Sequence, residues 1–171
     1  MRPTQHPIIL VVVMTLLVAG LAAAWLGFRK AEVERYYHQT FVMEDSSMEP
    51  TIAKDTELES DTRYETLQRG DVVVVSSPVD RQSLARRVIG LPGETIEFSN
   101  DQMTIMNNEN PSGFVLEETY TQDTLARTRF SWTLKEDEYF VLSDNRSDGN
   151  DSSKFGPVPR SSILAKIIGP Y

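Results

Sequence analysis

The stretch RRVIGLPGE at residues 86–94 decides the fold, because it joins a β-branched run to a tight turn. Pro92 presets φ for the first central position of a type II turn, and Gly93 supplies the positive φ that the second position needs. The stretch therefore predicts a strand that ends in a turn. Two arginines entering such a strand are unusual, and we expect one of them to point inward, towards a carboxylate.

Short runs of the same character recur on both sides of this stretch, and turn signals such as Arg69-Gly70-Asp71 separate them. Many short strands at close spacing predict a mainly β domain with a barrel-like or coiled sheet. The pattern is weakest over residues 107–129, which we interpret as a variable excursion. The expected strands cover residues 41–43, 72–75, 83–89, 95–98, 103–106, 114–116, 128–134, 139–142 and 163–168.

The N-terminal region contains an apolar segment, Ile8 to Phe28, with no charge over 21 residues. At about 1.5 Å per residue, a helix of that length reaches roughly 30 Å, the thickness of the hydrocarbon core of a bilayer. Trp25 lies near its end, where an aromatic belt is expected. Residues 1–30 are therefore predicted to be a tail and a transmembrane anchor, continued by a charged helix over residues 31–39.

A cleavable secretory signal is the competing interpretation of this segment, since Ala22-Ala23-Ala24 offers small residues for a cut. The apolar region of such signals runs about 7–15 residues, and the charged region before it is here Arg2 alone, which favours the uncleaved anchor. Charge does not settle the orientation. Arg29, Lys30 and Arg35 follow the segment, so the count of basic residues would place the C-terminal part in the cytoplasm.

The composition excludes several classes of function. The formal charge is −8, and residues 1–30 hold three basic residues and no acid, so the remainder carries about −11. An acidic domain lacks the basic patch that nucleic-acid phosphates require, so no nucleic-acid partner is predicted. The chain has no cysteine, which excludes disulfides and thiol catalysis. Its only histidines are His6 and His38, so no multi-histidine metal site is predicted.

Four blocks along the chain hold residues that could carry chemistry. Ser47, in SMEPT at residues 47–51, follows an apolar strand and precedes a proline turn, where a nucleophile can be exposed. An isolated serine of this kind is more often a cap or a turn former. The second block is RGD at 69–71 before a valine strand, and the third is 86–94. The fourth, SDNRSDGNDSS at 143–153, would alone be interpreted as a solvated loop.

Taken together and in this order, the four blocks resemble the type I signal peptidases, the serine proteases that remove signal peptides from exported proteins. The pattern of that family reads S-M-x-P-T, R-G-D before a hydrophobic strand, K-R-V-I-G-L-P-G-D and G-D-N-R-x-x-S-x-D-S-R. This chain reads SMEPT, RGDVVVV, RRVIGLPGE and SDNRSDGNDSS. The resemblance covers nearly the whole chain. It implies a signal-peptidase-like catalytic domain over residues 31–171, with the signal-peptidase/LexA-like coiled β-sheet fold and one N-terminal transmembrane helix.

By this resemblance Ser47 is the nucleophile, and position 86 holds the general base, normally a lysine. Lysine suits the task because burial disfavours its charged form and lowers its pKa towards neutrality. Arg86 stands there instead. Arginine stays protonated and presents no acceptor, so it could orient Ser47 or stabilise an oxyanion but should not take a proton near neutral pH. No other lysine falls at a matching place in the pattern.

Further departures from the family pattern lie around the same chemistry. Gly149 replaces the hydroxyl that normally binds the base, and Asp45 replaces the small residue that borders the oxyanion hole. A carboxylate there would oppose developing negative charge if it pointed inward. Arg87 and Asp144 match positions that pair in the family. The candidate oxyanion and structural residues are Asp45, Ser46, Arg87, Asp144, Asn145, Arg146, Asp151 and Ser152.

Three accounts of Arg86 stay open. The chain could cleave with a compensating base such as Asp45 or by a slow, high-pH route. It could be a weakened or inactive homologue that binds substrates without cutting them. Arg86 could also be an introduced change that traps the enzyme. His38 is a more remote candidate base, since exposed histidines beside an anchor are usually just solvated.

The resemblance implies a single-pass protein of the cell membrane whose domain lies on the extracytoplasmic side and cleaves exported preproteins after small residues. The extended signal-peptide segment would bind by strand addition near residues 41–45 and 83–87. Preproteins and membrane lipid are the expected partners, and no metal or organic cofactor is implied. The alternative is a binding or assembly factor for exported or pilus proteins. A LexA-like self-cleaving repressor is a third possibility, against which the transmembrane segment and the lack of a DNA-binding element argue.

Overall fold

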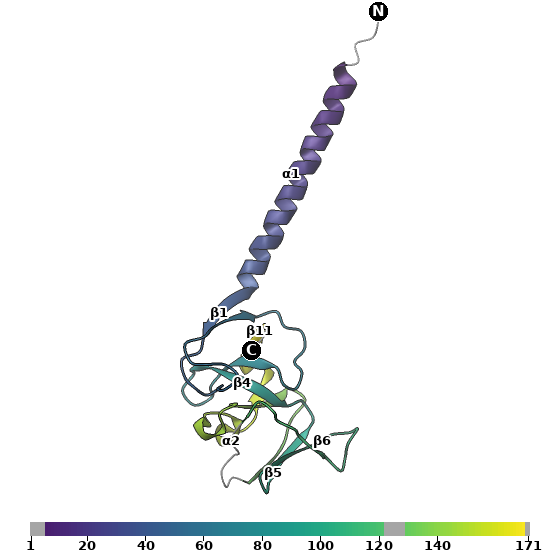
Figure 1. The fold of residues 1–171 in the computed structure, drawn as a ribbon. Helices are drawn as coiled ribbons and strands as arrows, with labels where there is room; N and C mark the ends of the chain where they lie inside the picture. The colour runs from purple at the N-terminus through teal and green to yellow at the C-terminus, as the bar shows by residue number, and fades with distance from the viewer. Residues whose placement is uncertain (1–5, 122–128, 170–171) are drawn as a thin grey trace, which may run out of the picture. The chain divides into compact units, whose positions relative to one another are not determined.

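The computed structural model describes residues 6–121 and 129–169, and the chain divides into two units between His38 and Gln39. Each unit is described by itself. The first is dominated by α1 (His6–Tyr37), drawn in purple and blue in Figure 1. Its segment Ile9–Val33 is long and apolar enough to cross a membrane, with a mean hydropathy of 2.6. The helix ends two residues earlier than expected, because His38 already belongs to a strand.

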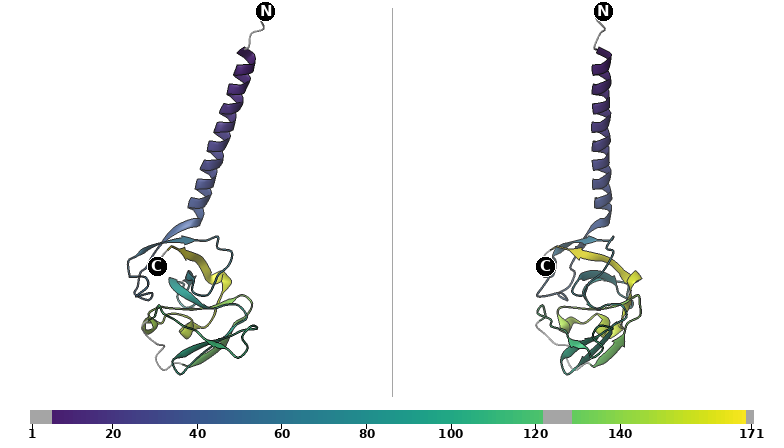
Figure 2. Two further views of the ribbon diagram at one scale, coloured as in Figure 1. Left: turned by 45° about the vertical axis from the view of Figure 1, so that its right-hand side comes forward. Right: turned by 90° about the vertical axis from the view of Figure 1, so that its right-hand side faces the viewer.

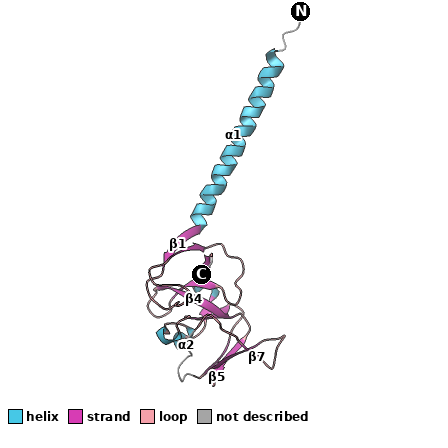
Figure 3. Cartoon of the chain, viewed as in Figure 1, coloured by secondary structure: helices cyan, strands magenta, loops and turns pink. Residues whose placement is uncertain are grey.

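The second unit contains a seven-stranded sheet and a four-stranded sheet, which confirms the mainly β prediction. Figure 2 shows the strands of this unit curled around one another, and Figure 3 shows that short helices occupy little of it. The sheet orders are β1-β2-β11-β3-β4-β9-β10 and β7-β6-β5-β8. The strands are β1 (His38–Val42), β2 (Glu57–Asp61), β3 (Val72–Ser76), β4 (Ser83–Gly90), β5 (Thr95–Ser99), β6 (Gln102–Met106), β7 (Phe114–Val115), β8 (Phe130–Thr133), β9 (Glu138–Leu142), β10 (Val158–Pro159) and β11 (Ile163–Ile168). The short helices are η1 (Arg146–Asp148), α2 (Ser152–Phe155) and η2 (Arg160–Ser162).

Most expected strands are present, with shifted ends. β1 begins three residues before the predicted start, and β8 covers only the centre of the predicted 128–134, of which residue 128 lies outside the described residues. The sequence analysis missed β2, whose sequence ELESD buries Leu58 and Ser60, exposes its two glutamates and leaves Asp61 partly buried. Such a strand has one large apolar residue, so its period of two is hidden.

Strand β3 lies between β4 and β11 and is buried on both faces. Val72 and Val74 pack into one apolar cluster with Met43 and Met48. Val73 and Val75, on the opposite face, pack into another cluster around β9. Each fully buried valine contributes about 1.5–3 kcal/mol relative to an exposed one. This run of four valines therefore anchors the sheet from which β4 is positioned.

Strand β4 pairs with β3 on one edge and with β9 on the other, over different parts of its length. Ser83 to Arg87 pair with β3, and pairing with β9 begins at Arg87 and shifts register between Val88 and Gly90. A Cβ on Gly90 would lie 2.1 Å from Cδ1 of Ile96 and 3.0 Å from Cβ of Phe140, so only glycine allows this close approach. Arg87 pairs with Val72 of β3 on one edge and with Leu142 of β9 on the other, whereas Arg86 pairs with Val73 of β3.

The predicted turn after β4 is present, with Gly93 at φ 78°. The carboxylate of Glu94 accepts a hydrogen bond from the Leu91 amide at 2.8 Å and pairs with Arg69 at 2.6 Å. Arg69 also donates to the carbonyl of Ile89. The turn is therefore held by a buried carboxylate as well as by its Pro-Gly sequence.

Candidate active site

The site centres on a contact between Ser47 and Arg86. Arg86, on β4, donates a hydrogen bond from Nη1 to Oγ of Ser47 at 2.7 Å. Ser47 is fully buried and Arg86 is 1% exposed. The resemblance makes Ser47 the nucleophile and position 86 the place of the base, and the two side chains are in contact in a buried place. The prediction of an exposed serine at a strand end is wrong. Ser47 lies in a turn beyond the end of β1, and the residues of the site bury it.

The chemistry of this contact follows from the guanidinium. Arg86 also donates to the carbonyls of Ala85 at 2.5 Å and Asn150 at 3.0 Å. A guanidinium has donors only and keeps its protons at any ordinary pH. Ser47 Oγ is therefore an acceptor towards Arg86, and the hydroxyl proton must point elsewhere. The side chain at position 86 orients the serine but cannot deprotonate it.

The backbone amide of Ser47 is also engaged. It donates to Oδ1 of Asp45 at 3.0 Å, which closes a short turn two residues long. In acyl transfer, the amide of the nucleophile is a natural donor to the oxyanion that forms on the substrate. Here a carboxylate occupies that donor. The sequence analysis considered an inward-pointing Asp45, and the carboxylate is turned towards the Ser47 amide.

Residues 143–152, which we call the site loop, hold the turn of Ser47 in place. The Asn145 amide donates to the Ser47 carbonyl at 2.9 Å, and its side-chain nitrogen donates to the Ser46 carbonyl at 3.3 Å. The loop is closed on itself, since Asp151 Oδ2 accepts the Ser143 amide at 2.9 Å. Ser152 Oγ accepts the amide of Val141 at 3.1 Å. Most of these side chains are buried, so the solvated-loop interpretation is wrong.

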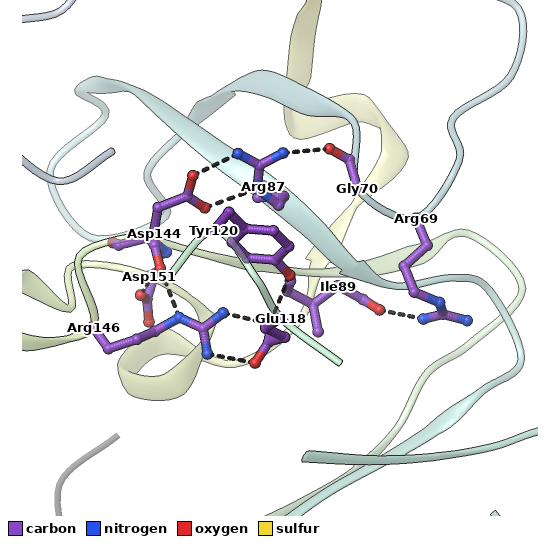
Figure 4. Close-up of polar contacts among 10 residues, drawn as sticks. Arg69, Gly70, Arg87, Ile89, Glu118, Tyr120, Asp144, Arg146 and Asp151 are labelled. Carbon is purple, nitrogen blue, oxygen red and sulfur yellow. Dashed lines mark hydrogen bonds and ion pairs between the residues drawn. The ribbon is translucent and has the colours of Figure 1, made fainter. Parts of the chain in front are cut away.

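Arg87 makes the inward contact with a carboxylate that the sequence predicted. It donates to both oxygens of Asp144, at 2.8 and 2.5 Å, and to the carbonyl of Gly70 at 2.8 Å (Figure 4). The two side chains are 7% and 1% exposed. The guanidinium lies over the ring of Tyr120, 4.2 Å from its centroid. This buried pair joins β4 to the start of the site loop.

Two residues of the supposed variable excursion also reach the site, and sequence reasoning missed both. Glu118 accepts from Arg146 at 2.5 and 3.0 Å and from the hydroxyl of Tyr120 at 2.7 Å (Figure 4). Burial raises the pKa of Tyr120, and the negative charge of Glu118 raises it further. The excursion from residue 107 includes β7, and its residues 122–128 lie outside the described residues. No periodic pattern in the sequence predicts the contact of Glu118 with Arg146 or that of Tyr120 with Arg87.

Gly149, which replaces the hydroxyl of the family pattern, lies beside Ser153 and Lys154. A Cβ built on Gly149 would meet Oγ of Ser153 at 3.6 Å and Cε of Lys154 at 3.8 Å, both ordinary contacts. A serine would therefore fit at position 149 without strain. Lys154 matches no catalytic position in the family pattern. Its side chain is exposed and lies next to Gly149. His38 lies on β1 with an exposed side chain.

Comparison with known proteins places this arrangement in a family. The family model described as signal peptidase, peptidase S26, matches residues 8–171. The chain belongs to the signal peptidase family. This confirms the resemblance drawn from the four sequence blocks.

Relatives and a solved structure agree with membership of the signal peptidases. Signal peptidase I V of Bacillus subtilis strain 168 is 32% identical over 162 residues, covering 88% of this chain and 94% of the relative. Signal peptidase I of Streptococcus pneumoniae serotype 4 is 28% identical, over 72% of this chain and 77% of the relative. A crystal structure of a signal peptidase I from Enterococcus faecalis V583 matches with a TM-score of 0.50 and 32% identity. It covers 61% of this chain and 98% of its own.

Proposed function

We propose that this chain is a membrane-anchored serine endopeptidase that removes signal peptides from exported preproteins after small residues, with a low rate imposed by Arg86. The observation that carries the proposal is the 2.7 Å hydrogen bond between Arg86 and Ser47 Oγ in a buried site. It puts a hydroxyl and the group at the usual place of the base at the distance that proton transfer requires. Similarity to signal peptidases I supports the substrate class.

The rate follows from the missing proton acceptor. Removing a general base typically costs about 10²–10⁴ in rate, and what remains comes from positioning and binding. Asp45 adds to this loss, because its carboxylate competes with an oxyanion for the Ser47 amide. A slow peptidase with an intact scaffold is the expected result.

Substrate binding by strand addition is supported by the pairing of β4. Ser83, Leu84 and Ala85 pair with β3, whereas the β9 ladder described in the structure starts only at Arg87. The other edge of Ser83 to Ala85 leads directly to Arg86 and Ser47. An extended peptide laid along it would bring successive carbonyls past the hydroxyl. The stretch from Phe41 to Asp45 would be the facing wall.

The anchor and the side of the membrane are also part of the proposal. α1 offers an apolar span of 25 residues, and signal peptides cross the membrane before they are cut. We therefore place α1 in the bilayer as an uncleaved anchor and the second unit on the extracytoplasmic side, with preproteins and lipid as its partners. A cysteine introduced in the domain would be labelled by an impermeant thiol reagent in intact cells if this placement is right.

A binding or assembly factor for exported or pilus proteins is the second candidate. One observation favours it: both polar groups of Ser47 needed for acyl transfer, the hydroxyl and the amide, are hydrogen-bonded to charged residues that oppose the reaction. Such a site would hold an extended segment without cutting it.

A stepwise restoration separates the two candidates. The full chain in detergent is given a peptide with an Ala-x-Ala site, and cleavage is compared in four proteins: native, Arg86→Lys, Arg86→Lys/Gly149→Ser, and the latter with Asp45→Ser. Each is paired with its Ser47→Ala form, and Arg81→Lys, an exchange at an exposed arginine, is the matched control. We expect Arg86→Lys to gain about 10²-fold or more, and each later step to add to the gain.

The outcomes divide cleanly. Native cleavage above that of Ser47→Ala supports the slow peptidase. Native cleavage equal to Ser47→Ala, together with retained peptide binding and a gain on restoration, supports the binding factor. If no restored protein exceeds its Ser47→Ala partner, Ser47 is not a nucleophile and the peptidase proposal is refuted.

A further inference from the structure

The geometry points to Glu118 and Tyr120 as positioning residues that hold the site loop against Ser47 and Arg86. Neither touches the reacting atoms. Both act through Arg146 and Arg87, from a segment whose sequence showed no pattern. The inference deepens the proposed function and rests on the proposed role of Ser47, but its structural part can be measured without any cleavage.

The site loop contacts the turn of Ser47 and the side chain of Arg86. Asn145 binds the carbonyl of Ser47 through its amide, and the carbonyl of Asn150 accepts Nε of Arg86 at 3.0 Å. The loop therefore touches both members of the central pair, one near each of its ends. A displacement of the loop would move the hydroxyl and the residue at position 86 relative to each other. Misplacement by about 1 Å is enough to cost roughly 10²-fold in rate.

Arg146 and Glu118 hold the site loop in place. Arg146 donates from Nε to the carbonyl of Ser143 at 2.8 Å, inside the loop, and from both terminal nitrogens to Glu118. The side chains of Arg146 and Glu118 are 2% and 12% exposed. Paired, charge-assisted hydrogen bonds of this kind are the strong ones. Removing the carboxylate would leave a buried guanidinium with its charge uncompensated at that place, which favours local opening of the loop.

Tyr120 connects the same segment to β4 through Arg87. The Tyr120 hydroxyl donates to Glu118, and its ring lies under the Arg87 guanidinium. Arg87 is the residue after Arg86. Glu118 and Tyr120 thus connect the site loop to the strand that carries Arg86, as the labelled side chains in Figure 4 show.

The segment itself is built for this contact. Glu117 and Thr119 are exposed, whereas Glu118 and Tyr120 are partly buried, so the two residues that contact the site are the ones turned away from solvent. Glu118 contacts a charged group of the site, whereas Tyr120 contacts Arg87 and also packs against the apolar cluster that contains Phe140 and Leu142. Glu117 provides a matched control, because the same exchange of glutamate for glutamine one residue away changes the charge but not the contact.

The experiment measures amide hydrogen exchange in the full chain in detergent, in the native protein and in Glu118→Gln, Glu118→Asp, Tyr120→Phe and Glu117→Gln. The probe is the Asn145 amide, and the reference is the Arg160 amide, which donates to Asp137 at 2.7 Å away from the site loop. We expect Asn145 in Glu118→Gln to exchange about tenfold faster or more, because hydrogen bonds to a charged group are lost. Tyr120→Phe should show a smaller increase, Glu117→Gln none, and Glu118→Asp a partial return to the native rate.

A kinetic readout accompanies the exchange. In the Arg86→Lys background, Glu118→Gln should lower kcat and leave KM nearly unchanged, because the loop positions the hydroxyl and does not form the strand edge. If the Arg86→Lys protein does not cleave, the proposed function fails while the exchange result still decides this inference. Asn145 exchange within twofold of that in Glu117→Gln, or an equal rise at Asn145 and Arg160, would overturn it.

Discussion

The buried pair of Arg87 and Asp144 provides a test of how the site is supported. We consider Asp144→Asn, which keeps the size of the side chain and removes its charge. The amide nitrogen would then face guanidinium donors, and one of the two hydrogen bonds, at 2.8 and 2.5 Å, would be replaced by a contact between donors. Breaking one side of a buried ion pair costs about 3–5 kcal/mol. The side chains are 7% and 1% exposed, so solvent offers little compensation.

The loss is measured by urea unfolding of the full chain in detergent, followed by near-ultraviolet circular dichroism. In thermal unfolding, a loss of this size would appear as a fall in Tm of roughly 6–20 °C for a chain of this length. Asp101→Asn is the control, because Asp101 is exposed with φ 61°, a conformation that asparagine tolerates. The control should change the free energy of unfolding by less than about 0.5 kcal/mol.

The double variant Arg87→Met/Asp144→Leu completes the test. Replacing both charges by apolar groups of similar volume leaves no uncompensated charge, so the double variant should be more stable than Asp144→Asn. The reasoning would be refuted by an Asp144→Asn protein within 1 kcal/mol of the native one, or by a double variant no more stable than the single one.

Three further outcomes are expected. Gly90→Ala should lose about 1–3 kcal/mol of stability in urea unfolding, because its Cβ would overlap Ile96 and press on Phe140, whereas Gly149→Ala, with room around it, should lose less. Burial raises the pKa of Tyr120, so above about pH 10 the unfolded chain loses a proton that the folded chain keeps; stability should therefore fall with rising pH, and less steeply in Tyr120→Phe. Lys154→Met should leave the cleavage rate of the Arg86→Lys protein unchanged; a large fall would show that the amine beside Gly149 takes part in proton transfer.

Local patterns made part of the site predictable. The Pro-Gly turn, the valine strand β3 and an inward arginine are consequences of neighbouring residues, and the structure has all three. Which arginine meets Asp144 depends on the register of β4 against β9, and only the resemblance to the signal peptidases, in which the matching positions pair, predicted Arg87. Residues 87 and 144 are 57 positions apart, and no periodic pattern encodes that distance.

The remaining features depend on long-range packing. Ser47 is buried because the site loop closes over its turn, a contact across 98 positions that a local prediction of an exposed nucleophile could not anticipate. Glu118 and Tyr120 lie among polar residues, so the sequence alone suggests that they are solvated. Their role depends on contacts with Arg146 and Arg87, which are distant in the sequence. β2 was missed for the same reason, since its acids conceal an alternating strand.

The guanidinium on the serine oxygen has a practical consequence for detection. Covalent reagents that report serine hydrolases, such as fluorophosphonates, react with a hydroxyl whose proton is being drawn away. At position 47 the oxygen receives a proton donor instead, so we expect this protein to go unlabelled in surveys that rely on such probes.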